Sequence, residues 1–578
     1  MNKTHLKLIL TSLLIVSGTG CGNSESGQDI AEGGIEGTGR VATSSTSVGT
    51  ITGFGSVFVN GVEYETGQAS VDTDDNENAT EDDLEIGMFV TIQGSVNADA
   101  VTGDAVSIHY SEDIKGYVQA IDVNAGKLII MGQEVNTDEL TVYEDVTLET
   151  LLVGDFVEVS GLTTGSGVLL ATRIEKETAT VNSVIKVKGA VSDLDVLNTT
   201  FSLEHLTVDY SSAEIDLGDD EVTLTDGIIV KVKGSQVVVN MPLIATKVEI
   251  KGKEYEAEEG QYLELDGVID SFVSVTSFTV NGQSITTNEV TEYKHGNSSF
   301  LVLGDRVKVK GELNSEGQLV ADEIKFHQDS DYEVEGTVDA VNLDAKTVTV
   351  LGVTFVLNEQ TLIDDGTASD IRFFNITDIS VGDFVEIKGF DSNGVLIATK
   401  LEREEEDDLD DEVELRGLAT AIDRVEYKFN LSGVTIHTSD ITGFEDASGE
   451  NVDQVTFFSN LEENINIKVE GSVIDGQVEA IEVEVKDEEE REDGADESEI
   501  SGLVSSVSET GFTLLHYTIE LSDTTELDVD DVSLSLADFL AQLEVGDEVH
   551  VEGLLSDNII TATSVEIELQ EEEGDVDA

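Results

Sequence analysis

The sequence has no tryptophan, one proline (Pro242), one cysteine (Cys21) and few basic residues. A single cysteine excludes a disulfide framework within the chain, and the eight histidines include no pair at a zinc-ligand spacing such as H-x-x-x-H. Only 30 lysines and arginines stand against 121 acidic residues, which gives a formal net charge of −91. Such a surface repels phosphate backbones, so we predict that no nucleic acid is a partner.

The residues that are abundant favour short strands. The chain has 53 glycines and many valines, isoleucines and threonines, a mixture typical of strands joined by glycine turns. Its 578 residues exceed the roughly 250–300 residues of a single hydrophobic core, so several smaller units are expected. The strong acidity suits solubility in a salty medium, and cation binding is the alternative explanation.

The N-terminus has the pattern of an export signal. Lys3 and Lys7 precede an apolar stretch at residues 8–16, which is too short to span a bilayer. We therefore predict a signal peptide at residues 1–20. The protein is then expected to be exported, to the outer membrane or the periplasm, with the cell surface as a further alternative.

Cys21 lies directly after this segment, in SGTGCGN. The motif resembles a bacterial lipobox, in which Thr19 and Gly20 fit, whereas Gly18 stands where leucine is usual. The resemblance implies that Cys21 is lipidated and that residues 21–44 form the lipid anchor and a flexible tether. The protein would then contact a membrane only through lipid. A secreted protein with a free thiol is the alternative.

A pattern that recurs seven times predicts the fold. Each copy has an apolar residue, two spacers, a turn residue, an alternating strand and a closing glycine seven positions after the turn residue. The turn residues are Gly87, Gly154, Gly227, Gly304, Gly382, Asn464 and Gly546. The closing glycines are Gly94, Gly161, Gly234, Gly311, Gly389, Gly471 and Gly553. Asparagine is the other residue that readily adopts positive φ, so the sixth copy indicates that the turn requires this backbone geometry.

Each copy is interpreted as five strands, with a short helix before the fourth strand in several copies. In the second copy we expect strands at residues 117–123, 127–131, 134–141, 156–160 and 168–175, and the helix pattern is clearest at residues 534–543. The predicted fold is all-β, with seven tandem five-stranded OB-like small β-barrel modules joined by short or acidic linkers. A set of open five-stranded sandwiches is the alternative.

The predicted boundaries follow from this repeat. The first five modules occupy residues 45–110, 111–176, 177–252, 253–328 and 329–403. The sixth and seventh modules follow acidic linkers within residues 404–486 and 487–569, and residues 570–578 form an acidic tail.

The repeated L-x-x-G-D-x-V-x-V-x-G, followed by G-x-x-x-A-x-x-I, resembles the bacterial family of unknown function DUF5666. The opening GTITGFGSVFVNGVEYET, at residues 49–66, is similar to the leading module of that family. The resemblance covers nearly all of residues 45–568 and is weaker in the third and sixth copies, where Ile228 and Ile465 follow the turn residue. It implies an envelope or secreted location and a small β-barrel, and it implies no activity and no catalytic residues.

The sequence has no nucleophile elbow, no P-loop and no dinucleotide-binding glycine motif between a strand and a helix. An aspartate follows the turn glycine in four copies, but Met88 occupies that position in the first copy, so we interpret the aspartate as a turn residue. The four are Asp155, Asp305, Asp383 and Asp547. We predict that the protein is not an enzyme and holds no resident cofactor.

One acidic loop is a weak candidate for calcium. Asp72, Asp74 and Asn76 place oxygens at alternate positions, as at the start of an EF-hand loop, and Asp83 stands where that loop ends. Glu77 occupies the position that needs glycine, so a solvated acidic loop is the alternative.

The sequence therefore predicts a non-enzymatic, exported modular protein of unknown biochemical role. Tethered to the envelope, it would have a structural role or bind an envelope polymer or a protein, since linked weak sites gain avidity. An acidic surface protein that binds calcium is the alternative.

Overall fold

The computed structural model describes residues 43–567, apart from residues 75, 124, 165–166, 181–182, 217–222, 236–241, 252–258, 368, 370, 393, 405–411, 440, 448, 450, 475–476, 487–495, 509, 515–516, 523, 530–531 and 557–558. The predicted signal peptide, Cys21, nearly all of the tether, much of both acidic linkers and the acidic tail lie outside the described residues. The described chain is all-β, with 60% strand and 4% helix. No helix in the described part combines the length and the apolar character needed to cross a membrane.

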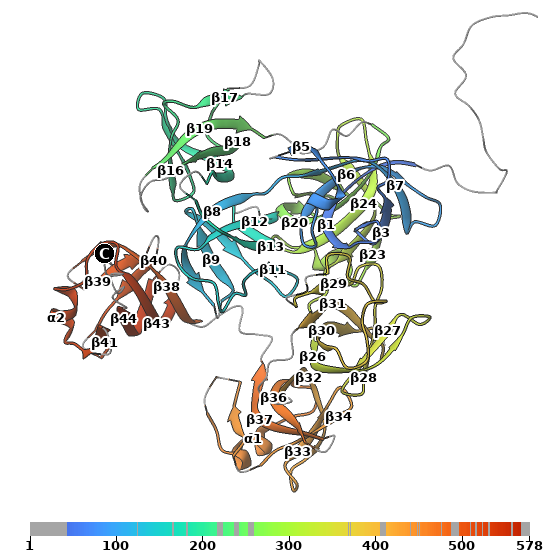
Figure 1. The fold of residues 1–578 in the computed structure, drawn as a ribbon, viewed down its shortest axis with the longest axis vertical. Helices are drawn as coiled ribbons and strands as arrows, with labels where there is room; N and C mark the ends of the chain where they lie inside the picture. The colour runs from blue at the N-terminus through green and yellow to red at the C-terminus, as the bar shows by residue number, and fades with distance from the viewer. Residues whose placement is uncertain are drawn as a thin grey trace, which may run out of the picture. The chain divides into compact units, whose positions relative to one another are not determined.

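The strands fall into seven sets along the chain, which we call units 1 to 7 (Figure 1). Unit 1 comprises β1 (Thr43–Gly53), β2 (Val57–Val59), β3 (Val62–Glu65), β4 (Ser70–Thr73), β5 (Asn76–Ala79), the 3-10 helix η1 (Glu81–Asp83), β6 (Phe89–Val96) and β7 (Thr102–Tyr110). Unit 2 comprises β8 (Ile114–Asp122), β9 (Lys127–Ile130), β10 (Gln133–Asn136), β11 (Val142–Glu144), β12 (Phe156–Thr163) and β13 (Leu169–Glu177). Unit 3 comprises β14 (Ile185–Asp195), β15 (Thr200–Leu203), β16 (Leu206–Asp209), β17 (Glu214–Asp216), β18 (Ile229–Ser235) and β19 (Leu243–Ile250).

The next two units have the same plan. Unit 4 comprises β20 (Tyr262–Ser274), β21 (Ser277–Val280), β22 (Gln283–Thr286), β23 (Glu292–Lys294), the 3-10 helix η2 (Ser298–Phe300), β24 (Arg306–Leu313) and β25 (Leu319–Phe326). Unit 5 comprises β26 (Tyr332–Asn342), β27 (Thr347–Val350), β28 (Val353–Val356), β29 (Leu362–Asp365), β30 (Phe384–Asp391) and β31 (Leu396–Glu404).

The last two units each contain a short α-helix before the penultimate strand. Unit 6 comprises β32 (Glu412–Asp423), β33 (Lys428–Leu431), β34 (Val434–His437), β35 (Gly443–Glu445), α1 (Gln454–Asn460), β36 (Asn466–Ile474) and β37 (Gln477–Lys486). Unit 7 comprises β38 (Asp496–Val507), β39 (Gly511–Leu514), β40 (Tyr517–Glu520), β41 (Glu526–Val529), β42 (Val532–Ser533), α2 (Leu536–Leu540), β43 (Glu548–Ser556) and β44 (Ile559–Ile567).

One order of strand pairing recurs in the units. The first strand pairs antiparallel with the second, the second antiparallel with the third, and the third parallel with the last. The last strand pairs antiparallel with the penultimate strand, which returns to the first. Units 5 to 7 have the same pairings. Hydrogen bonding therefore runs round each set of five strands, and the alternating apolar side chains lie buried within it.

The third strand expected in unit 2, at residues 134–141, is divided into β10 and β11. A turn interrupts it, because Thr141 donates its backbone N–H to the carbonyl of Asp138 (3.0 Å). Both pieces pair with β13, so the interruption leaves the order of the sheet unchanged.

The closing glycine and the alanine of the repeat form one cross-strand pair beside a β-bulge. In unit 2 this pair is Gly161 and Ala171, and the register shifts directly before it. A Cβ at Gly161 would collide with the carbonyl oxygen of Leu170, and the corresponding glycine of every unit meets a carbonyl of the last strand in the same way. This close approach explains why only glycine occupies the closing position.

Strand pairing also continues from one unit to another. β1 pairs in parallel with β20 through Ser45–Val48 and Tyr262–Leu265, and β26 pairs with β32. β8 pairs with both β14 and β38. The repeat alone does not predict these pairings, because each of them joins two different copies of the repeat.

Candidate functional site

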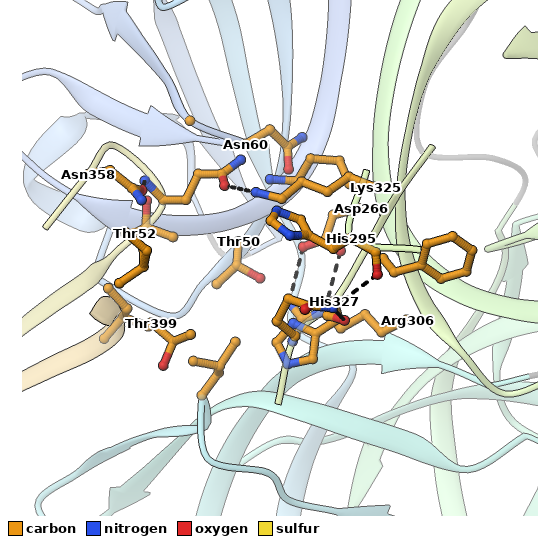
Figure 2. A pocket seen from close by; sticks show the side chains of 18 of the residues that line it. Thr50, Thr52, Asn60, Asp266, His295, Arg306, Lys325, His327, Asn358 and Thr399 are labelled. Atoms are coloured by element: carbon orange, nitrogen blue, oxygen red, sulfur yellow. Dashed lines mark hydrogen bonds and ion pairs between the residues drawn. The ribbon is translucent and has the colours of Figure 1, made fainter. Parts of the chain in front are cut away.

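A cavity of about 260 Å³ lies beside the outer face of unit 4, and units 1, 2 and 5 supply its other walls (Figure 2). Its walls carry several basic and imidazole side chains from unit 4, hydroxyl and amide groups from units 1 and 5, and apolar groups such as Phe390 and Ile397. Figure 2 shows the basic and imidazole side chains on one side and Asn358, Thr52 and Thr399 on the other.

Basic residues are concentrated on this wall. Arg306, Lys308 and Lys325 line the cavity together with His295 and His327. The whole chain has only 30 lysines and arginines against 121 acidic residues, so three in one small cavity, against the single lining carboxylate of Asp266, are a local reversal of the protein's charge. A cavity of this kind is suited to an anion.

The alternation of β24 places these side chains together. Val307 and Val309 are 1% and 0% exposed and point into the core of unit 4. Arg306, Lys308 and Lys310 occupy the intervening positions and therefore share the opposite face of the strand. The sequence RVKVKG is thus a strand with one apolar face and one fully cationic face.

The neighbouring strands β20 and β25 contribute few carboxylates to this cationic face. Lys308 stands opposite Asp266 of β20 on one side and opposite Lys325 of β25 on the other. Asp266 is paired instead with Arg306, whose guanidinium lies 3.0 Å away. Among the described residues, the Lys308 ammonium has neither an ion pair nor a hydrogen bond.

Lys325 also lacks a carboxylate partner in the described part of the chain. Its ammonium donates to the side-chain oxygen of Gln360, a neutral acceptor from unit 5. By contrast, Lys310 at the edge of the same face is 2.7 Å from the carboxylate of Glu264. Two lysines that face each other across the strands therefore make no direct ion pair with a carboxylate of the described residues.

The pKa values of these groups reflect the imbalance. Burial lowers the pKa of Lys325 to about 8, and the charges of Lys308 and Lys310 act in the same direction. Burial also lowers the pKa of Lys308, although Asp266 opposes the shift. Burial lowers the pKa of His295 and His327 as well, reinforced by Lys325 and Arg306 respectively. An anion in the cavity would stabilise the protonated form of each group.

The wall from unit 1 carries polar atoms that have no partner. Thr50 and Thr52 lie on β1, and Asn60 lies in the turn between β2 and β3. Thr50 is 7% exposed and Asn60 is 4% exposed. The two threonine hydroxyls and the side-chain oxygen of Asn60 make no hydrogen bond with any described residue. Neighbouring groups cover these three atoms, and unpaired buried polar atoms are unfavourable, so a ligand that reached them would gain hydrogen bonds.

The seven turn residues lie outside the cavity and have the predicted backbone geometry. Their φ angles are 84° at Gly87, 90° at Gly154, 84° at Gly227, 97° at Gly304, 97° at Gly382, 67° at Asn464 and 100° at Gly546. The aspartate that follows four of these glycines accepts a hydrogen bond from the backbone three residues earlier, as Asp305 does from Val302 (3.1 Å). These residues therefore shape the chain before the penultimate strand.

Each of the four candidate calcium ligands interacts with a different partner within the protein. The carboxylate of Asp72 contacts His109, and that of Asp74 is paired with Lys231. Asn76 accepts from the backbone of Asn78 (3.1 Å), and Asp83 accepts from the backbone of Thr80 (2.7 Å). Calcium binding by this loop stays a prediction, and the structure shows structural roles for each of the four side chains.

Two other groups of carboxylates lie close enough to share a cation, among the residues that the structure describes. Glu85, Glu144 and Glu175 surround the guanidinium of Arg173, which is paired with all three. In the second group, Glu386 is 2.8 Å from Lys388, and Glu402 is 2.6 Å from Lys400; the third member is Glu404. Protein cations therefore already pair with five of these six carboxylates.

Comparison with protein families matches five segments that together span more than half of the chain, at residues 115–175, 266–325, 335–402, 416–484 and 501–566. The chain belongs to the DUF5666 family. The family is described as a domain of unknown function. The matched segments lie in units 2, 4, 5, 6 and 7, so the sixth copy matches although its turn residue is asparagine. Unit 1, which the sequence analysis placed among the better copies, lies outside the matched segments.

The five matched units share a hydrogen bond that was not predicted from the sequence. A threonine hydroxyl donates to the carbonyl of the alanine that pairs with the closing glycine, at 2.7–2.9 Å. The pairs are Thr141 with Ala171, Thr291 with Ala321, Thr361 with Ala398, Thr442 with Ala480, and Thr525 with Ala562. This bond ties the segment after the third strand to the last strand of the unit.

Two other comparisons give no further assignment. No curated protein matches the chain. A solved structure titled "drosophila Unr CSD456" is similar at 14% sequence identity, over 37% of this chain and 97% of that chain, with a TM-score of 0.11.

The cationic cavity was not predicted from the sequence. The pattern that could have revealed it is RVKVKG, because three basic residues at alternate positions are unusual in so acidic a chain. The contributions of Thr50 and Gln360 had no such pattern, because they come from units 1 and 5.

Proposed function

We propose that this protein is a non-enzymatic, exported array of OB-like barrels that binds an anionic polymer of the cell envelope. The order of strand pairing in each unit supports an OB-like barrel, since five strands in a Greek-key arrangement close on themselves. A short helical segment before the penultimate strand, as at α1 and α2, agrees with that fold.

The cationic cavity is the observation that carries the binding role. Lys308 and Lys325 present ammonium groups that lack carboxylate partners among the described residues. Like charges opposite each other on neighbouring strands are destabilising unless carboxylates balance them. Lys388 and Lys400 of unit 5 also stand opposite each other, but each is paired with a glutamate, whereas Lys308 and Lys325 are not. An anionic group of a ligand would balance both.

The export pattern of residues 1–20 and the lipobox-like sequence at Cys21 support a place at the envelope. The net charge of −91, which argues against nucleic acid as a partner, repels other polyanions as well, so attraction of an anionic envelope polymer has to come from the cationic cavity alone.

Fluorescence anisotropy with labelled dextran sulfate, and with labelled dextran as the uncharged control, tests this function on the full chain. We expect binding of dextran sulfate only, and Lys308→Gln should weaken it by roughly tenfold or more, the contribution of a charge-assisted hydrogen bond. Lys310→Gln is the matched control, because Lys310 lies on the same face but is paired with Glu264. Equal binding by both variants would refute the proposal.

A further inference from the structure

The cavity has two chemically different walls. Lys308 and Lys325 face each other across β24 and β25 on one wall, and each lacks a carboxylate partner among the described residues. On the other wall, the hydroxyls of Thr50 and Thr52 and the amide oxygen of Asn60 are buried without hydrogen bonds to the described residues. The two sets of groups require different features of a ligand.

The lysine wall favours a dianion over a monoanion. A carboxylate carries one negative charge and would balance one ammonium group. A phosphate ester carries about −1.5 to −2 at neutral pH and has three acceptor oxygens, so it can pair with both lysines. Directly opposite residues of neighbouring antiparallel strands have Cβ atoms only about 4.5–5.5 Å apart, which lets one tetrahedral group reach both.

The threonine wall favours a body with hydroxyl groups. Each unpaired hydroxyl can donate one hydrogen bond and accept others, and the amide oxygen of Asn60 can only accept. Sugar hydroxyls supply both donors and acceptors, whereas an alkyl chain would leave these buried atoms unpaired. The cavity, at about 260 Å³, is smaller than the roughly 300–1,000 Å³ of sites for drug-sized ligands, so it suits one sugar ring at a time.

We propose that the cavity binds a phosphorylated sugar, with the phosphate between Lys308 and Lys325 and the sugar hydroxyls on Thr50, Thr52 and Asn60. This inference rests on the proposed function and specifies its ligand. Both a free sugar phosphate and a phosphorylated sugar within an envelope polymer present this chemistry.

Isothermal titration of the full chain tests the ligand class with four probes: ribose 5-phosphate, inorganic phosphate, ribose and glucuronate. We expect ribose 5-phosphate to bind most tightly, by roughly tenfold over glucuronate, because the lysines gain a second charge to pair with. Inorganic phosphate should bind more weakly than ribose 5-phosphate, and ribose should give no measurable heat. Phosphorylated dextran, titrated in the same way, distinguishes the two sources: binding as tight as that of ribose 5-phosphate supports a polymer-borne sugar phosphate, and binding of ribose 5-phosphate alone supports the free one.

Two variants test the threonine wall and the lysine wall of the cavity separately. Thr50→Val removes a hydroxyl with little change in shape and should weaken ribose 5-phosphate by roughly two- to tenfold while leaving inorganic phosphate unchanged. Thr399→Val is the matched control, since that hydroxyl lines the cavity but is already bonded to Ser330 (2.6 Å). Lys325→Gln should weaken both phosphates, and it also serves as a second test if Lys308→Gln does not fold.

Equal affinity for glucuronate and ribose 5-phosphate would refute the inference that the lysines select a dianion. If Thr50→Val kept the parent protein's preference for ribose 5-phosphate over inorganic phosphate, the inference that the threonine wall binds the sugar would be refuted. In both cases a Lys308-dependent response to dextran sulfate would leave the proposed function intact. Absence of any Lys308-dependent binding to all of these anions would refute the proposed function itself.

Discussion

Lys231 offers a sharp test of how units 1, 2 and 3 are held together. Its side chain is 0% exposed and is paired with Asp74 of unit 1. Its ammonium also donates to the hydroxyl of Ser111 (3.1 Å) and lies 3.5 Å from the carboxylate of Glu112. One buried cation of unit 3 therefore balances carboxylates from elsewhere in the chain, and Lys231→Met would remove it with little change in volume.

The stability lost in Lys231→Met depends on the carboxylates that stay buried without this lysine. Removing one partner of a buried ion pair costs about 3–5 kcal/mol, because the other charge stays buried and uncompensated. Glu112 keeps Lys186, whereas Asp74 keeps only Lys251, whose ammonium lies 3.5 Å from the carboxylate, so Asp74 is the group most affected. Burial alone would raise the pKa of Asp74, but Lys231 and Lys251 outweigh it and hold that pKa well below its usual range. Lys231→Met should therefore increase local opening by roughly 10²- to 10³-fold at neutral pH.

Hydrogen exchange is the appropriate assay, because a chain with several cores does not unfold in one two-state transition. Peptides that contain β4 and β18 should lose protection in the variant, whereas peptides from unit 7 should not. Lys247→Met is the control, since that side chain is 34% exposed and pairs with Glu249, where a surface pair contributes about 0–1 kcal/mol. Protection in Lys231→Met that stays within about 1 kcal/mol of the parent protein would show that the ion pair does not hold these units.

Three further predictions concern pH and backbone geometry. Burial, together with neighbouring carboxylates, raises the pKa of Glu335 to about 7 and that of Glu404 to about 8, above their ordinary values. The stability that these two protonated carboxyl groups contribute to unit 5 is full at low pH and is lost as pH rises through 7–8. The urea midpoint of unit 5, followed by pulse proteolysis, should therefore be higher at pH 5.5 than at pH 9. Glu404→Gln should reduce this difference. Burial lowers the pKa of Lys325 to about 8, so affinity for phosphate in isothermal titration should decline as pH rises through 8, and Lys325→Gln should flatten the profile between pH 7.5 and 9. Gly311→Ala should destabilise unit 4 by roughly 1–3 kcal/mol, measured by hydrogen exchange of peptides from β24 and β25, because its Cβ would meet the carbonyl of Val320. Gly53→Ala, whose Cβ meets only Phe58 at 3.7 Å, should change stability little on steric grounds.

The repeat was predictable from sequence because its requirements are local. A turn residue with positive φ and a strand of alternating apolar residues each depend on a few neighbouring positions. Asn464, with φ of 67°, shows this most clearly, since its side chain differs from glycine but its backbone conformation does not. Tertiary structure was needed to explain the closing glycine, because the carbonyl that excludes a side chain belongs to another strand.

Local sequence could not reveal which outward-facing side chains meet. Asp74 looked like a calcium ligand beside Asp72, but its partner is Lys231, 157 residues later in the chain. Lys308 and Lys325 are close in sequence and share a hairpin, whereas Thr50 reaches the same cavity only because β1 pairs with β20. The sequence by itself determined the strands, the turns and the repeated core, since hydrophobic alternation and φ preferences act over a few residues. Only the tertiary structure decided the cationic cavity, because burial and charge pairing depend on contacts between distant units.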